Sequence, residues 1–201
     1  MQSVPDVSPV GQLYVLLQHR NGNDERKPRA KAELSQRNEM EMEATNEYRI
    51  WKAGMEDLPK ILQLQYLAYQ NQAALFSNRN IPPLTQTLDE VIEEYHKGII
   101  LKMVNEDGMA IGSIRAWEME GTVHIGKLMV HPDYWHHGFG TKLLNEIELL
   151  FPRKRYELFT STRSVDNIRL YQRLGYREFD RKRVDEELEF VYMEKTQNEL
   201  N

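Results

Sequence analysis

A loop with two glycines lies between an apolar segment and an amphipathic one, and it constrains the fold of this chain more than any other feature. Residues 131–144 read HPDYWHHGFGTKLL, with Gly138 and Gly140 separated by one residue, and the apolar segment GKLMV comes directly before them. Behind the loop, apolar side chains recur at helical spacing (Leu143, Leu144, Ile147, Leu150 and Phe151). The segment therefore predicts a strand, a glycine loop and a helix in succession, as in α/β proteins.

The glycine loop has the properties of an anion-binding site. The first N–H groups of a helix have no partner inside the helix and carry the positive end of its dipole. Glycines at this point remove side chains that would keep an anion away. The order Thr141-Lys142 differs from the Gly-Lys-Ser/Thr of a P-loop, and Leu143 stands where a dinucleotide fingerprint has its third glycine. A plain turn that uses glycine for its φ angles is the alternative.

The segment before the loop, TVHIGKLMV over residues 122–130, changes the phase of its apolar alternation. Apolar residues occupy one phase up to Ile125 and the opposite phase from Leu128. One extra residue near Gly126-Lys127 would restore the register, which predicts a β-bulge with unpaired backbone groups for a ligand that carries amides. A strand buried on both faces, where alternation means little, is the alternative.

A second helix is predicted by SVDNIRLYQRLGY, with Ser164 as its N-cap and Gly175 at its C-terminal end. Asn167 and Tyr171 are four residues apart and therefore share one face of this helix. A tyrosine with an ordinary pKa of about 10 keeps its proton at neutral pH and can give it to a leaving thiolate. Half-buried packing is the other interpretation of a tyrosine on a helix.

From residue 48 onward, the patterns predict strands and helices that form one mixed sheet. The strands are expected at 48–53, 99–104, 109–119, 122–130, 156–161, 176–184 and 188–195, and the helices at 55–70, 85–98, 140–151 and 165–174. Asp107-Gly108 is typical of a hairpin turn. The order β-α-α-β-β-β-α-β-α-β-β indicates an α/β fold in a single domain over residues 47–196.

Composition excludes several classes of protein. The chain has no cysteine, which excludes disulfides, thiolate catalysis and thiolate metal sites. A formal net charge of −5 argues against a nucleic-acid binder. No apolar run approaches the roughly 20 residues of a membrane span, and the first residues lack a signal-peptide pattern. We therefore expect a cytoplasmic protein that binds neither nucleic acid nor membrane.

The histidines near the loop do not predict a metal site. His124, His131, His136 and His137 fall within a short span. However, adjacent histidines rarely face one centre, and no acidic or thiolate partner lies at ligand spacing. We predict no bound metal.

The first 46 residues differ in composition from the rest and predict an N-terminal extension. The stretch over residues 19–47, HRNGNDERKPRAKAELSQRNEMEMEATNE, is charged and almost free of large apolar side chains, which is typical of disorder. Only LYVLL, at 13–17, is a candidate strand or docking segment. A start codon placed too far upstream, with Met40 and Met42 as nearby alternatives, or an added leader would also produce such an extension. Residues 197–201 are expected to be a C-terminal tail.

Taken in order, these features resemble the GNAT superfamily of acyl-CoA-dependent N-acyltransferases. The resemblance rests on IGKLMVHPDYWHHGFGTKLL followed by STRSVDNIRLYQRLGYREF, and it covers residues 48–195 including the order of elements. The family motif Gln/Arg-x-x-Gly-x-Gly/Ala has its glycines at Gly138 and Gly140, whereas Trp135 replaces the usual Gln or Arg. The resemblance implies a mixed central sheet with a bulged, splayed fourth strand and about four flanking helices.

The resemblance also implies that acetyl-CoA is the co-substrate and that its acetyl group moves to an amine by direct attack, with no acyl-enzyme. The backbones of Leu128, Met129 and Val130 would pair with the pantetheine and the acetyl carbonyl. Asn167 would contact the pantetheine arm, and Tyr171 would be the general acid for the departing thiolate. Backbone amides of the loop would hold the pyrophosphate of coenzyme A (His136, His137, Gly138, Phe139, Gly140 and Thr141).

The base that removes a proton from the acceptor is not identified by the resemblance. Such a base needs to be a carboxylate, an imidazole or a water chain near the cleft. Glu118, Glu120 and His124 are candidates because they lie near the start of the bulged strand, although each is also an ordinary surface residue.

The acceptor is expected to be a small-molecule or peptide amine. In the family, the first two helices, their connection and the last hairpin shape the acceptor site, which here means residues 66–95 and the turn at Asp185-Glu186-Glu187. Three aromatic residues are candidates for an apolar pocket (Tyr66, Tyr69 and Phe76), and the acidic turn would attract a cationic amine.

Two non-catalytic functions are alternatives to the prediction of an enzyme. One is a module that holds acyl-CoA on the same fold, suggested by Trp135 and the unidentified base, and the other is a scaffold for an assembly. A homodimer is a further possibility.

Overall fold

The computed structural model describes residues 48–75, 81–152, 154–185 and 188–196, with side chains described up to residue 70 in the first of these ranges. The expectations for residues 1–46 and 197–201, and those for Phe76, Glu186 and Glu187, lie outside the described residues.

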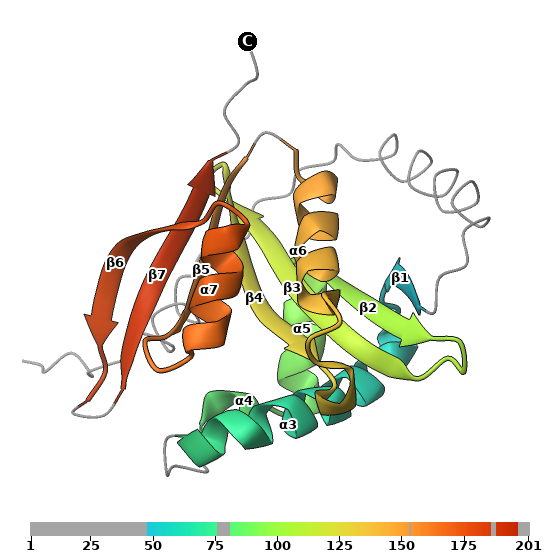
Figure 1. The fold of residues 1–201 in the computed structure, drawn as a ribbon. Helices are drawn as coiled ribbons and strands as arrows, with labels where there is room; N and C mark the ends of the chain where they lie inside the picture. The colour runs from blue at the N-terminus through green and yellow to red at the C-terminus, as the bar shows by residue number, and fades with distance from the viewer. Residues whose placement is uncertain (1–47, 76–80, 153, 186–187, 197–201) are drawn as a thin grey trace, which may run out of the picture. The chain divides into compact units, whose positions relative to one another are not determined.

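The described strands form one seven-stranded sheet in the order β1-β2-β3-β4-β5-β7-β6 (Figure 1). Neighbouring strands are antiparallel, except that β4 and β5 are parallel. The strands are β1 (Tyr48–Lys52), β2 (Ile99–Asn105), β3 (Ala110–Met119), β4 (Thr122–Val130), β5 (Arg155–Ser161), β6 (Arg177–Arg183) and β7 (Glu189–Thr196). The predicted mixed sheet is confirmed.

The helices follow the predicted order with one addition, α4 (Pro82–Thr85). This single turn lies in the connection that contains Pro82 and Pro83, and proline is well suited to the first turn of a helix. A four-residue helix is too short to show periodicity, so the sequence did not predict it. The other helices are α3 (Leu58–Leu75), α5 (Leu88–Lys97), α6 (Phe139–Leu150) and α7 (Val165–Arg173), with short 3₁₀ turns η1 (Met55–Asp57) and η2 (Pro132–Tyr134).

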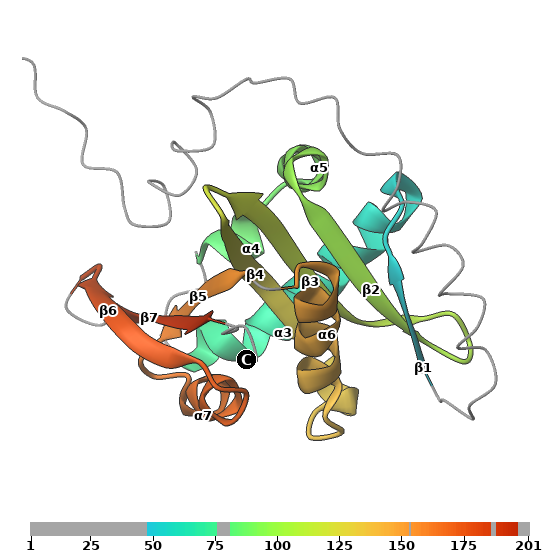
Figure 2. The ribbon, with the colours of Figure 1, turned by 90° about the horizontal axis from the view of Figure 1, so that it is seen from above.

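The helices cover the two faces of the sheet and make two separate cores. Helices α6 and α7 lie on the face turned to the viewer in Figure 1, and α5 lies behind the sheet; Figure 2 shows the same layers from above. Leu143 and Ile147 of α6 pack with Ile114 of β3 in the larger core. Leu58 of α3 and Val91 of α5 belong to the smaller core on the opposite face.

The predicted bulge in β4 is confirmed. Gly126 pairs with Arg115 of β3 and Met129 pairs with Ser113, so two residues of β4 lie opposite Ile114 alone. The first of these two residues, Lys127, has a φ of 52°. The bulge moves the apolar residues of β4 back to the face of the larger core after Gly126, which explains the change of phase in the sequence.

Strands β4 and β5 separate soon after they begin to pair. Their register contains three pairs, of which the last joins His124 to Glu157. Beyond this pair, residues 125–130 of β4 have no strand partner on the β5 side within the described chain. The two strands diverge in Figure 1, and their separation leaves backbone N–H and C=O groups of β4 without a ladder.

Candidate active site

The glycine loop is built around a left-handed residue at the start of α6. Gly138 is the N-cap of α6 with φ 77° and ψ 7°, a left-handed backbone conformation that residues other than glycine rarely adopt. A Cβ atom added there would meet nothing within 4 Å, so the loop is open at this point. The first backbone hydrogen bond of the helix runs from Lys142 N to Gly138 O at 3.1 Å. The N–H groups between these residues precede the helical ladder and are available to a ligand.

Gly140 connects the loop to the strand before it and to the helix α7. A Cβ atom at Gly140 would lie 3.4 Å from Leu170 Cδ2 and 3.9 Å from Leu128 Cδ2. The start of α6, the open end of β4 and α7 therefore meet at this glycine. Thr141, in the first turn, is partly buried.

The three residues at the end of β4 alternate between the two cores. Leu128 and Val130 are partly buried against the larger core, and Met129 is buried in the smaller one. Their backbones belong to the stretch of β4 that has left β5. Side chains on both faces thus hold this edge in place, and on its β5 side the backbone has no strand partner.

Trp135 fastens the loop to the end of β4. Its indole N–H donates a hydrogen bond to the carbonyl oxygen of Val130 at 2.8 Å, and 39% of the residue is exposed. The aromatic side chain that departs from the family motif is therefore a structural tie between strand and loop.

The two histidines of the loop have separate surroundings. His136 is exposed and has a φ of 64°. The Nδ1 atom of His137 lies 2.8 Å from the carbonyl oxygen of Trp135, and its ring stacks on that of Phe139 with centroids 5.9 Å apart. Over the described ranges, no group of three or more His, Asp or Glu side chains could hold a metal ion.

Tyr171 of α7 lies beside the opening between β4 and β5. The residue is buried, and Asn167, one turn earlier, is partly buried. Burial raises the pKa of Tyr171, and Tyr69 of α3 adds to the effect. Burial also raises the pKa of Tyr69 to about 12, with Arg115 opposing and Glu94 reinforcing the change. Tyr69 thus acts on the pKa of Tyr171 although the two residues belong to cores on opposite faces of the sheet.

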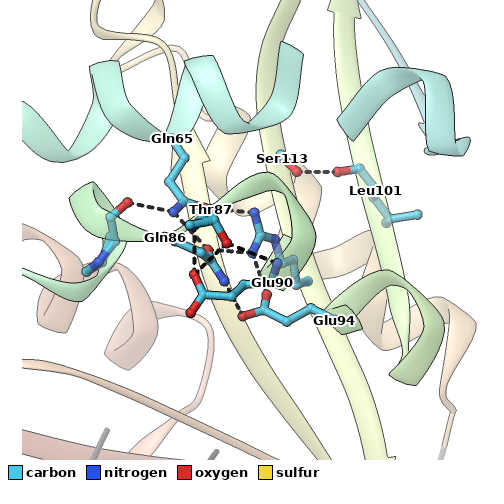
Figure 3. Close-up of polar contacts among 9 residues, drawn as sticks. Gln65, Gln86, Thr87, Glu90, Glu94, Leu101 and Ser113 are labelled. Atoms are coloured by element: carbon cyan, nitrogen blue, oxygen red, sulfur yellow. Dashed lines mark hydrogen bonds and ion pairs between the residues drawn. The ribbon is translucent and has the colours of Figure 1, made fainter. Parts of the chain in front are cut away.

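A buried polar network, absent from the sequence predictions, lies under α3 and α5 (Figure 3). Arg115 of β3 is 2% exposed, and its guanidinium donates to Gln65 Oε1 at 2.7 Å and to Gln86 Oε1 at 3.1 Å. It also forms an ion pair with Glu94. Gln65 Nε2 donates to Gln86 Oε1 at 2.9 Å and Gln86 Nε2 donates to Glu94 Oε1 at 2.6 Å. The network ties α3 and α5 to β3. An arginine inside the apolar strand AIGSIRAW is the signal that could have revealed it.

Lys127 is a second feature that sequence reasoning did not assign. Its Nζ lies 6.0 Å from the centroid of the Tyr69 ring, on the α3 face of the sheet. Burial lowers the pKa of Lys127 to about 8. The negative charges of Glu94 and Glu90 raise this pKa, whereas the positive charge of Arg115 lowers it further. No hydrogen bond or salt bridge joins its amine to another residue of the described chain.

Of the three candidate bases, the structure places one at the point where β4 and β5 part. His124 stacks on Trp117 with ring centroids 5.5 Å apart, and its Nδ1 lies 3.5 Å from Glu157 Oε2. Burial lowers the pKa of His124, with Glu157 opposing, so the imidazole is neutral at neutral pH. Glu118 instead forms an ion pair with Lys154 at 2.6 Å, and Glu120 has a φ of 51° beside Gly121 in the turn between β3 and β4.

The comparisons with known proteins agree with this architecture. The model of the family described as Acetyltransferase (GNAT) family matches residues 58–176. No curated protein matches the chain.

Three solved structures are similar in fold. The PaiA N-acetyltransferase of Thermoplasma acidophilum, in complex with coenzyme A, has 18% identity and a TM-score of 0.65, covering 75% of this chain and 99% of its own. The ribosomal-protein-S18-alanine N-acetyltransferase of Escherichia coli has 17% identity and a TM-score of 0.61, covering 77% and 99%. YncA of Salmonella typhimurium, with its cofactor acetyl-CoA, has 21% identity and a TM-score of 0.60, covering 77% and 96%.

Proposed function

The chain belongs to the GNAT acetyltransferase family, and from that premise we propose that it transfers the acetyl group of acetyl-CoA directly to an amine, with Tyr171 as the general acid. One observation carries the proposal. The unpaired edge of β4 leads into the glycine loop, and Tyr171 lies beside the same opening.

The residues around the opening fit acetyl-CoA in three respects. The β4 edge offers backbone groups to the amides of pantetheine, and we assign this contact to Leu128, Met129 and Val130. The amides of residues 136–141 lie around the N-terminus of α6, whose first turn has no acidic residue, and are assigned to the pyrophosphate. Asn167 is assigned to the pantetheine arm because it lies one turn before Tyr171 on α7.

The chemistry needs one bond made, one bond broken and two proton movements. The amine nitrogen forms a C–N bond to the thioester carbon, the C–S bond breaks, and the thiolate takes the proton of Tyr171. A thiol has a pKa of about 8.5, so a buried tyrosine of higher pKa does not protonate the sulfur unaided. The acylated nitrogen must return a proton to the tyrosyl oxygen in the same step. Burial thus keeps Tyr171 protonated until the thiolate forms.

Several finer expectations belong to the proposal. They are a small-molecule or peptide amine as acceptor, a cytoplasmic location, a homodimer, and no binding to nucleic acid. Across the described residues, no helix is long and apolar enough to cross a membrane. The proposal keeps an extension over residues 1–46, the N-acetyltransferase domain over 47–196 and a tail over 197–201.

The test is acetyl transfer by the full chain and by Tyr171→Phe across a panel of amines, followed by release of free coenzyme thiol. Removal of the general acid is expected to lower kcat roughly 10²- to 10⁴-fold. Binding of acetyl-CoA, measured by thermal shift, should change little; at 100 times Kd it stabilises the fold by about 2.7 kcal/mol. Tyr192→Phe, on β7, is the control that loses a phenol elsewhere.

Two outcomes would contradict the proposal. Unchanged turnover in Tyr171→Phe would remove this residue from the mechanism. Acetyl-CoA binding without transfer to any amine would favour the non-catalytic module.

A further inference from the structure

Lys127 occupies a backbone conformation that its neighbour glycine would adopt without strain. Its φ of 52° is in the left-handed region, whereas Gly126, the residue directly before the bulge, does not have a positive φ. Side chains other than glycine are uncommon at such angles because Cβ crowds the following carbonyl. A lysine therefore stands where the backbone φ is strained, while the glycine beside it has an ordinary backbone conformation. Strain of this kind is found where a side chain is needed at a fixed point.

The side chain of Lys127 lies among ionisable groups from three other elements. Its Nζ is 6.0 Å from the centroid of the Tyr69 ring of α3, and the charges of Glu90 and Glu94 of α5 and of Arg115 of β3 act on its pKa. Arg115 and Glu94 are bound to each other and to the two glutamines of the buried network. In the described chain, no hydrogen bond or salt bridge joins the amine of Lys127 to another residue, in contrast to the guanidinium of Arg115, so the amine can interact with an incoming molecule.

Lys127 is next to the place where the thioester is expected. Leu128, the following residue, begins the backbone edge that we assign to pantetheine and the acetyl carbonyl. Tyr69 lies near Lys127 and also acts on the pKa of Tyr171, which links the surroundings of the amine to those of the proposed acid.

We propose that Lys127 is the general base of the reaction and that its neutral amine takes a proton from the ammonium group of the acceptor. The inference rests on the proposed function. The acceptor ammonium gives one proton to Lys127 Nζ, and its freed lone pair attacks the thioester carbon. The C–S bond then breaks, Tyr171 protonates the sulfur, and the new amide nitrogen restores Tyr171. The proton on Lys127 leaves to solvent, so each turnover releases one proton, one amide and one coenzyme thiol.

Two further observations agree with this role. The pKa of Lys127, lowered by burial, leaves a useful fraction of neutral amine near pH 8. Glu90 and Glu94 place negative charge near the amine of Lys127, which favours the approach of a cationic acceptor.

The decisive variant is Lys127→Arg in the full chain. A guanidinium keeps the positive charge but does not give up its proton, so it can anchor an anionic group and cannot act as a base. We expect kcat/KM for the best amine of the panel to fall roughly 10²- to 10⁴-fold, with KM for acetyl-CoA unchanged. Lys60→Arg, exposed on α3, is the matched control. Wild-type kcat in Lys127→Arg would overturn the proposal.

The pH profile separates Lys127 from His124. With a lysine base, kcat/KM of the wild type rises with pH and levels above about 8, because the protonated amine is inactive below its pKa. We expect His124→Gln to keep this rise and Lys127→Arg to lose it, with the same acceptor in each measurement. The opposite pattern would assign the base to His124.

The outcomes also separate this inference from the proposed function. A wild-type chain that acetylates no amine would refute both. A wild-type chain that is active while Lys127→Arg matches it would refute the role of Lys127 only. If Lys127→Arg loses its thermal shift with acetyl-CoA, Lys127→Met supplies an uncharged replacement of similar length, for which the same loss of activity is expected.

Discussion

The opening between β4 and β5 has two unlike sides. On the side of α6 and α7, the groups offered to a ligand are backbone atoms: the edge of β4 and the first amides of α6. On the side of α3 and α5, they are side chains, namely Lys127 above Tyr69 and the network around Arg115. A backbone site tolerates changes of side chain, whereas a side-chain site depends on each residue. The difference predicts where substitutions will cost most.

Arg115→Ala should have the largest effect on stability. The guanidinium donates to Gln65, Gln86 and Glu94. Its loss leaves Gln65 Oε1 without its donor and the Glu94 carboxylate without its counter-charge, and it removes one of the two donors to Gln86 Oε1. Removing one member of a buried ion pair costs about 3 kcal/mol or more of stability. We expect the lower value for Arg115→Ala, because Glu94 keeps some contact with water.

Urea unfolding measures this cost. The exposed pair of Arg181 with Glu178 provides the control, since solvent screens it and Arg181→Ala should leave the free energy of unfolding almost unchanged. If Arg115→Ala lowers the free energy of unfolding no more than Arg181→Ala does, the buried network does not stabilise the packing of α3 and α5 on the sheet.

The strain at Lys127 is tested by comparing Lys127→Gly with Lys127→Ala. Both variants lose the amine, and only alanine keeps a Cβ at the φ of 52°. The glycine variant should be more stable than the alanine variant by about 1 kcal/mol. Both should be nearly inactive. Equal unfolding free energies would show that the bulge relaxes and that the lysine is not held under strain.

Trp135→Gln should have the smallest effect. It restores the residue expected from the family motif and removes the indole hydrogen bond to Val130. Because we assign the pyrophosphate to backbone amides, we expect the Kd for acetyl-CoA, measured by calorimetry, to change less than tenfold. A larger change in Kd would mean that binding of acetyl-CoA on the α6 and α7 side also depends on the side chain of residue 135.

The sequence predicted the backbone side well because its signals are local. The bulge followed from a change of phase within nine residues of β4, and the loop followed from two glycines before an amphipathic helix. The order of strands and helices was also correct, apart from the four-residue α4.

The side-chain side was missed for an equally physical reason. Arg115 and Gln65 are 50 residues apart, and nothing in the sequence near either indicates the other. Two of the candidate bases near the start of β4, Glu118 and Glu120, do not reach the opening, because the register places them at its paired end.

The sequence by itself therefore determined the GNAT fold, through two motifs and the order of elements. It also determined the bulge and the glycine loop, because each of these depends on spacing within a single segment. Only the tertiary structure decided which side chains gather on the α3 side, and that Lys127 lies beside Tyr69 there. Those positions depend on how α3 and α5 pack against the sheet, and on where β4 parts from β5.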